Sequence, residues 1–263
     1  MSDGVTMLDD EQSSKTEAAY RLLRRDILAT RLAPAAPLKL STLRDTYGIG
    51  WTPLREALSR LEAERLVTAI SNRGFAVAPV SRAELEDLAR ARLVVELPLL
   101  VESIENGDRQ WEDAVVAAHY RLSRCGSVLD DPSDDAVDAW YENHDAFHAA
   151  LLGAATSSWL LRFNATISDQ LHRHHRFLGL APTLRAAASR TDGHRKAMAA
   201  LRDAVAIEHH TALMEAALDR DTERAKTLMS VHIGYTLQVY AQSEPGADAP
   251  QSRPKRKRPS GKT

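Results

Sequence analysis

The stretch GIGWTPLREALSRLEAERLVTAISNRGFAVAP, residues 48–79, is the most informative part of this chain. Thr52 can cap a helix whose first position is Pro53, where the missing N–H costs nothing and φ is already helical. We expect this helix to run to about Glu64. One side of this helix carries an apolar stripe with helical spacing, formed by Leu54, Ala57, Leu58 and Leu61. The opposite, solvent-facing side carries Thr52, Arg55, Ser59 and Glu62.

The segments on either side of this helix complete a recognisable motif. Upstream, Ser41 is a suitable cap for a short helix in LSTLRDTYGIG, which Gly48 would end. Two short helices joined by a glycine turn form a helix-turn-helix. Downstream, residues 66–70 and 75–79 are rich in Val, Ile and Phe, and the Ser-Asn-Arg-Gly between them has the chemistry of a hairpin turn. The pattern predicts a β-wing.

The exposed face of the predicted helix suits the major groove of double-stranded DNA. An arginine there can pair bidentately with guanine, and one at a wing tip can reach phosphate or the minor groove. Arg55 and Arg73 are therefore the leading predicted contacts, although Arg55 could instead pair with Glu56 or Glu62 on its own helix. The predicted DNA-contacting residues are Ser41, Arg44, Trp51, Thr52, Arg55, Ser59, Arg73 and Gly74.

This segment resembles the winged helix of the GntR family of bacterial regulators, in which a proline, an arginine and a following Glu-Ala-Leu open the recognition helix. The matching residues are Pro53, Arg55, Glu56, Ala57 and Leu58. The resemblance spans about residues 16–80 and includes Leu61, the Leu66-Val67 pair and the Asn72-Arg73-Gly74-Phe75 wing turn. Trp51 departs from it, because many members carry a DNA-contacting arginine there. Trp51 could contact a thymine methyl or the sugar backbone, or pack against its own domain.

Composition and charge are consistent with a two-domain soluble protein. The chain has 263 residues, of which 44% are hydrophobic and 27% charged. The single Cys125 excludes an internal disulfide framework, and the absence of a membrane-length apolar run or a signal-peptide core predicts a cytoplasmic protein. Residues 15–82 hold 12 Lys/Arg against 6 Asp/Glu, whereas residues 83–244 hold 16 against 25. The basic part coincides with the predicted DNA-binding part.

The fold class we expect is mainly α, with an N-terminal winged helix-turn-helix followed by an antiparallel bundle of six or seven helices. Apolar spacing predicts bundle helices at about 82–105, 109–126, 134–153, 157–178, 194–219 and 221–242. The expected boundaries are a disordered segment at 1–14, the DNA-binding domain at 15–80, the effector-binding and dimerisation domain at 81–243, and a disordered basic tail at 244–263. The PKRKRP cluster in that tail could add nonspecific DNA affinity or be a dispensable extension.

The predicted bundle resembles the effector-binding domain of the FadR branch of the GntR family, an FCD-type domain, over about residues 83–236. The resemblance rests on Arg92 followed by Glu96, on Phe147-His148, on Glu208 with His210, and on Leu228-Met229 preceding His232. It implies that the bundle binds a small organic acid, often beside a metal. The chain most resembles members that respond to short dicarboxylic acids such as glutarate.

Four histidines form the predicted metal site. His144 and His148 are four residues apart and project from one helix face, and His210 and His232 would come from the last two helices, brought to one level by their antiparallel packing. Family members carry an aspartate where this chain has His144, so the site would lose one negative charge. Nitrogen-rich ligation suits zinc, with nickel as the second choice; the alternative is a weaker or absent metal, with the histidines binding the effector directly.

Two arginines are candidates for binding the effector's carboxylate. Arg92 matches the family's carboxylate-binding arginine, whose planar guanidinium can clamp an acid bidentately. The alternative is a helical pair between Arg92 and Glu96. Arg173 is the second candidate; it belongs to the run LHRHHRF, residues 171–177, which we expect to be a polar helix face that could line the pocket.

These features predict a homodimeric, ligand-responsive repressor that binds a palindromic operator through two winged helices. It would be neither an enzyme nor a membrane protein. One rival is a metal-sensing regulator, in which the ion itself is the signal. A second rival is a metal-dependent hydrolase that uses Glu208 beside the histidines. Four protein ligands leave less open coordination than a catalytic zinc site keeps, which argues against the hydrolase.

Overall fold

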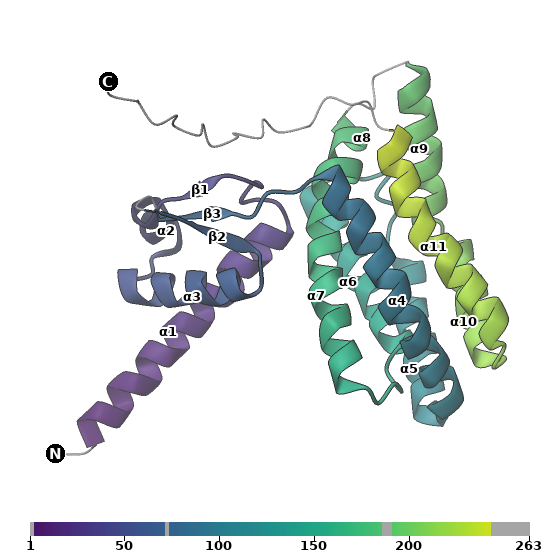
Figure 1. The fold of residues 1–263 in the computed structure, drawn as a ribbon, viewed down its shortest axis with the longest axis horizontal. Helices are drawn as coiled ribbons and strands as arrows, with labels where there is room; N and C mark the ends of the chain where they lie inside the picture. The colour runs from purple at the N-terminus through teal and green to yellow at the C-terminus, as the bar shows by residue number, and fades with distance from the viewer. Residues whose placement is uncertain (1–2, 72–73, 186–190, 243–263) are drawn as a thin grey trace, which may run out of the picture.

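The computed structural model describes residues 3–71, 74–185 and 191–242, and it shows two domains joined by a short connection between strand β3 and helix α4 (Figure 1). The N-terminal domain packs three helices beside a small sheet. The C-terminal domain is all-helical. This arrangement confirms the predicted fold class.

The N-terminal domain is a winged helix-turn-helix. Its sheet has the strand order β1-β3-β2, and both strand pairs are antiparallel. The register of strands β2 and β3 places Val67 opposite Val77 and Ile70 opposite Gly74, so the two strands form the hairpin of the wing. The elements are α1 (Asp3–Leu28), β1 (Pro37–Leu38), α2 (Leu40–Tyr47), α3 (Trp51–Ala63), β2 (Val67–Ile70) and β3 (Gly74–Val77).

Helix α3 is held by α1, and the two contribute most of this domain's core. The predicted apolar stripe of α3 is fully buried, and α1 meets it with residues spaced by four, as one face of a helix requires. The buried side chains are Ala19, Leu23 and Ile27 from α1 and Leu54, Ala57, Leu58 and Leu61 from α3. The exposed face of α3 is thereby turned to solvent.

Three local expectations about this domain are corrected. Neither Ser41 nor Thr52 caps its helix, because each lies one residue inside it; α2 is preceded by Lys39 and α3 by Gly50, without a side-chain cap. Helix α1 starts at Asp3, within the segment 1–14 that we expected to be disordered. That segment contains no proline, so the helix can extend through it from its buried portion.

The C-terminal domain is an antiparallel bundle around one large apolar core (Figure 1). No helix in residues 3–71, 74–185 or 191–242 is long and apolar enough to cross a membrane. Residues 244–263, the expected basic tail, lie outside the described residues. The bundle consists of α4 (Arg82–Asn106), α5 (Arg109–Arg124), α6 (Asp134–Leu151), α7 (Ser158–His174), a π-helix (His175–Leu180), α8 (Ala181–Arg185), α9 (Asp192–Val205), α10 (Ile207–Leu218) and α11 (Thr222–Gln242).

The bundle departs from the predicted helix boundaries at two places. The expected helix 194–219 is divided at Ala206, whose extended backbone (φ −63°, ψ 129°) separates α9 from α10. No glycine or proline marks that break, so the sequence pattern did not show it. The expected helix 157–178 ends at His174 and continues as the π-helix, which changes the side-chain spacing just beyond the histidine run.

Candidate metal centre and DNA interface

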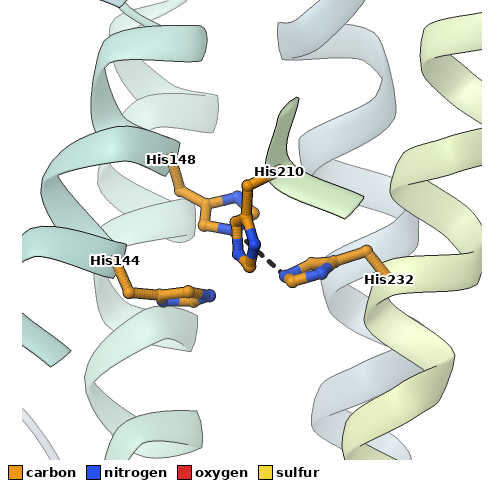
Figure 2. Close-up of side chains that lie close together, drawn as sticks. All are labelled: His144, His148, His210 and His232. Carbon is orange, nitrogen blue, oxygen red and sulfur yellow. Dashed lines mark hydrogen bonds between the residues drawn. The ribbon is translucent and has the colours of Figure 1, made fainter. Parts of the chain in front are cut away.

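Four histidines from three helices of the bundle converge on one point (Figure 2). Helix α6 contributes His144 and His148, α10 contributes His210, and α11 contributes His232. One ring nitrogen from each lies within 4.8 Å of the others. His148, His210 and His232 are buried and His144 is partly buried. The structure therefore brings together all four residues of the predicted metal site.

Helix geometry and a tight turn explain this convergence. His144 and His148 stand one turn apart on α6, and their ring centroids are 4.5 Å from each other. Between α10 and α11 the chain reverses at Arg220, which has the left-handed φ of 60°. The reversal makes α10 and α11 antiparallel neighbours and places the rings of His210 and His232 4.8 Å apart.

Hydrogen bonds outside the cluster fix which nitrogens can bind a cation. Nδ1 of His210 lies 3.0 Å from the carbonyl oxygen of Ala206, and Nδ1 of His144 lies 3.1 Å from Oδ1 of Asp145. Because both partners only accept, each Nδ1 carries the proton and each Nε2 keeps its lone pair. Nε2 of His210 is buried and has no hydrogen-bond partner among the described residues. A buried imidazole nitrogen with a free lone pair and no hydrogen-bond partner is expected of a histidine that ligates a metal ion.

The remaining pair has a spacing that suits a metal ion. Nε2 of His148 lies 3.1 Å from Nε2 of His232 (Figure 2). Zinc bound tetrahedrally at about 2.0–2.1 Å from each nitrogen would separate two ligand nitrogens by roughly 3.3–3.4 Å. The observed distance is close to that value, so this pair fits a divalent transition metal, and the other two histidines place a ligand nitrogen within 4.8 Å of it.

Burial keeps these imidazoles in the protonation state that metals require. It lowers the pKa of His148 and of His232 well below the ordinary value, with smaller contributions from neighbouring histidines and from Arg92. Burial, followed by the charge of His144, lowers the pKa of His210 to about 3. Neutral imidazole is the form that ligates a metal. His148, His210 and His232 are therefore in the form that can accept a cation near neutral pH.

Asp145 supports this cluster, a role that the sequence analysis did not assign to it. Its two carboxylate oxygens accept hydrogen bonds from Nδ1 of His144 and, at 3.2 Å, from Nδ1 of His172 on α7. Burial raises the pKa of Asp145, but the two histidine hydrogen bonds outweigh it and the net pKa is below the ordinary value. A carboxylate behind a ligand histidine orients the ring and raises its basicity. The only sequence signal is that Asp145 adjoins His144.

A cavity of about 400 Å³ adjoins the histidine cluster and has the size of a small-molecule site. His144 and His148 form part of its wall, and Arg92 from α4 lines it as well. The expected helical pair is also present, since Nε of Arg92 donates to Oε1 of Glu96 at 2.8 Å. A second cavity of about 60 Å³ with mostly apolar walls shares Arg92 and His144 with the first. Arg92 thus lines the same cavity as His144 and His148.

Arg173 does not lie in this site, which corrects the expectation that it clamps the effector. Its guanidinium is buried against the connection between the domains, where it donates to the carbonyl oxygens of Ala78 at 2.9 Å and Pro79 at 2.6 Å. It lines neither of these two cavities. Its neighbours His172 and His175 line the 400 Å³ cavity instead, so the run 171–177 is a largely buried helix face.

The recognition helix α3 presents Thr52, Arg55 and Ser59 to solvent, as expected. Arg55 forms no ion pair among the described residues, and its two candidate partners hydrogen-bond to other groups. Glu56 accepts a hydrogen bond from Thr16 at 2.6 Å, and Glu62 accepts one from the backbone N–H of Ala69 at 3.3 Å. The alternative interpretation of Arg55 as a helical ion pair is therefore not what the structure shows.

The remaining predicted DNA contacts surround this helix. Ser41 and Arg44 are exposed on α2, and Gly74 begins the second wing strand with φ of 90°. The side chain of Trp51 is 46% exposed, and the Arg44 guanidinium stacks on its ring at 5.0 Å. Both residues therefore remain available at the protein surface. Arg73 lies outside the described residues.

Comparison with known proteins agrees with this two-part organisation. The family model described as "Bacterial regulatory proteins, gntR family" matches residues 15–77, and the FCD domain model matches residues 87–235. The structure of E. coli McbR/YncC covers 87% of this chain and 97% of its own, with a TM-score of 0.64 and 20% identity. At that identity the likeness concerns the fold alone.

Two curated relatives extend over nearly the whole chain. The HTH-type transcriptional repressor GlaR of Escherichia coli (strain K12) is 34% identical over 227 residues, covering 86% of this chain and 96% of the relative. The uncharacterized HTH-type transcriptional regulator BphR of Paraburkholderia xenovorans (strain LB400) is 33% identical over 230 residues, covering 87% and 86% respectively. With these matches and an exposed recognition helix, the chain belongs to the GntR family of bacterial regulators with an FCD domain, and is a DNA-binding transcription regulator rather than an enzyme.

Proposed function

We propose that this protein is a homodimeric repressor that leaves a palindromic operator when a small carboxylic acid binds in the 400 Å³ cavity beside a bound metal ion. The observation that carries the proposal is that Arg92 lines the same cavity as His144 and His148, two members of the four-histidine cluster. A cationic guanidinium beside a metal site attracts a carboxylate, and its planar fork can bind both oxygens. A short dicarboxylate is the ligand class we favour.

The protein residues have separate tasks in this proposal. His144, His148, His210 and His232 would hold the ion, for which zinc is the first choice and nickel the second. When bound, the ion would add positive charge beside the cavity and so attract a carboxylate. Arg92 would bind the same carboxylate, with its own position fixed by Glu96. The acid changes operator occupancy only if it binds one arrangement of the two domains more tightly than the other.

The direct test uses duplex DNA from upstream of the protein's own coding sequence and the zinc-loaded full-length protein. DNA binding is followed by fluorescence anisotropy while succinate or glutarate is added, with and without a chelator. We expect DNA release by acid only in the presence of metal. Release by metal alone would instead identify a metal sensor, and indifference to both would refute the proposal.

Substitution of Arg92 separates DNA binding from the response to acid. Arg92→Ala should retain operator affinity and lose the acid response, because the guanidinium lies in the effector cavity and not in the winged helix. Arg90→Ala is the matched control, since Arg90 lies on the same helix and its side chain is 76% exposed. An unchanged acid response in Arg92→Ala would remove Arg92 from the site.

A further inference from the structure

Two residues that line the 400 Å³ cavity each carry a buried hydrogen-bond acceptor that no residue in the described part of the chain satisfies. One is Oε2 of Glu96 on α4, and the other is Oδ1 of Asn164 on α7. Both residues line the cavity. The Glu96 residue is only 1% exposed, so bulk water does not solvate its carboxylate. We call these two atoms the acceptor pair.

Neighbouring residues in the described part of the chain do not supply the missing hydrogen-bond donors. Oε1 of Glu96 is already held by Nε of Arg92 at 2.8 Å, which fixes the carboxylate and leaves Oε2 without a donor. A buried polar atom without a partner costs about 1–3 kcal/mol, and folded proteins rarely leave one unless water or a ligand meets it. A cavity next to the atom is where such a ligand would stand.

The acceptor pair requires a different chemical group on the ligand from the one that Arg92 and the metal site would bind. Arg92 and the metal site would bind a carboxylate, whereas the acceptor pair requires a hydrogen-bond donor. A carboxylic acid that carries only further carboxylates offers no donor at neutral pH. An ammonium would supply one, but it would stand close to both a guanidinium and a metal cation and be repelled by them. A hydroxyl donates without that repulsion.

We infer that the effector is a hydroxycarboxylic acid, whose carboxylate binds at Arg92 and the metal site and whose hydroxyl donates to one atom of the acceptor pair. This inference rests on the proposed function, because it assumes that the 400 Å³ cavity is the effector site. It adds the chemical class of the ligand and makes Glu96 and Asn164 specificity-determining residues.

The test is isothermal titration calorimetry on the zinc-loaded full-length protein with acids that differ only in one substituent. The series are succinate, malate and aspartate, and glutarate, 2-hydroxyglutarate and glutamate. We expect the hydroxy acid to bind at least about tenfold more tightly than its unsubstituted partner, a ratio equivalent to about 1.4 kcal/mol. Equal binding of the two would overturn the inference and leave the proposed function standing. Tightest binding of the amino acid would overturn the choice of hydroxyl, and no binding by any of these acids would refute both.

Variants assign the preference to the acceptor pair. Asn164→Leu and Glu96→Met are titrated with the same acids, and the hydroxy preference should fall to about one in at least one of them while zinc stoichiometry is retained. Asn164→Asp keeps an acceptor oxygen and should keep the preference even if total affinity falls. Asn143→Leu is the matched control, because Asn143 bonds the carbonyl of Ala139 on its own helix and lines neither of the two cavities. A tenfold preference that survives in both Asn164→Leu and Glu96→Met would overturn the assignment.

Discussion

The histidine cluster shows how single residues acquire a role from what they bond outside it. His210 is oriented by the carbonyl of Ala206 and His144 by the carboxylate of Asp145, and each ring therefore directs Nε2 inward. Hydrogen-bond partners also distinguish the two candidate effector-binding arginines, Arg92 and Arg173. Arg92 lines the cavity, whereas the guanidinium of Arg173 donates hydrogen bonds to two backbone carbonyls at the domain connection. Residue type alone did not distinguish them.

Loss of the carboxylate behind His144 should weaken metal binding. We expect Asp145→Ala to lower zinc affinity about 10–100-fold, the usual effect of removing a partner that orients a ligand histidine. Competition with a chromophoric chelator measures the dissociation constant. Asp135→Ala, at an exposed position of the same helix, is the control. An unaltered zinc affinity in Asp145→Ala would mean that Asp145 does not support the site.

The exposed arginine of α3 should carry sequence recognition. Arg55→Ala is expected to weaken operator binding by about 1–3 kcal/mol, the range for one bidentate base contact, and to leave the melting temperature unchanged because the side chain is exposed. Anisotropy titrations with the upstream DNA fragment measure the loss. Arg109→Ala, exposed on α5 in the other domain, should have no effect. Full affinity in Arg55→Ala would exclude Arg55 from the DNA interface.

At the scale of the element, helix periodicity and turn chemistry account for most of the winged helix. The apolar stripe of α3 packs on α1 as its spacing predicts, and Gly48 ends α2 in the left-handed region with φ of 67°. The helix starts were predicted less well. Neither Ser41 nor Thr52 marks the start of its helix. Each helix begins one residue earlier in the chain, at Leu40 and Trp51, and the residue before that is the first with an extended backbone.

The turn between α2 and α3 should require glycine at its first position. Gly48→Ala is expected to destabilise the protein by about 1–2 kcal/mol, because a Cβ is disfavoured in the left-handed conformation even where space is free. Urea denaturation measures the change. Gly126→Ala is the control, since its Cβ would also meet nothing within 4 Å and its φ is not in the left-handed region. Equal stability of the two variants would show that the turn tolerates the strain.

At the scale of the whole molecule, polar contacts connect the cavity to the recognition helix. Asp169 on α7 lines the 400 Å³ cavity and pairs with Arg24 on α1. Arg24 also lies 3.5 Å from Glu64, at the end of α3. Beside this pair, Gln170 donates to the carbonyl oxygens of Glu64 and Arg65 at 3.2 and 3.3 Å. Helix α7 therefore contacts both the 400 Å³ cavity and the end of α3.

Removal of that contact should uncouple the two domains. We expect Arg24→Met to bind acid and operator but to lose most of the acid-dependent change in operator affinity, which is typically 5–150-fold in allosteric proteins. The thermal shift caused by added acid measures acid binding, and fluorescence anisotropy of labelled DNA measures operator binding. Arg21→Met is the control, because Arg21 lies on the same helix and pairs with Glu17. A full acid response in Arg24→Met would show that coupling runs elsewhere.

The winged helix, the helical character of the bundle, the basic N-terminal part and the four histidines could be predicted from residue order, because periodicity, turn residues and charge are local properties. Three features became visible only in the folded chain: Asp145 supports His144, Arg173 holds the domain connection, and Glu96 and Asn164, which line one cavity, leave acceptors unsatisfied. The break at Ala206 also belongs to this second group. His148 and His232 are 84 residues apart yet share a 3.1 Å contact, and such a meeting depends on how helices pack and not on the residues beside each in the chain.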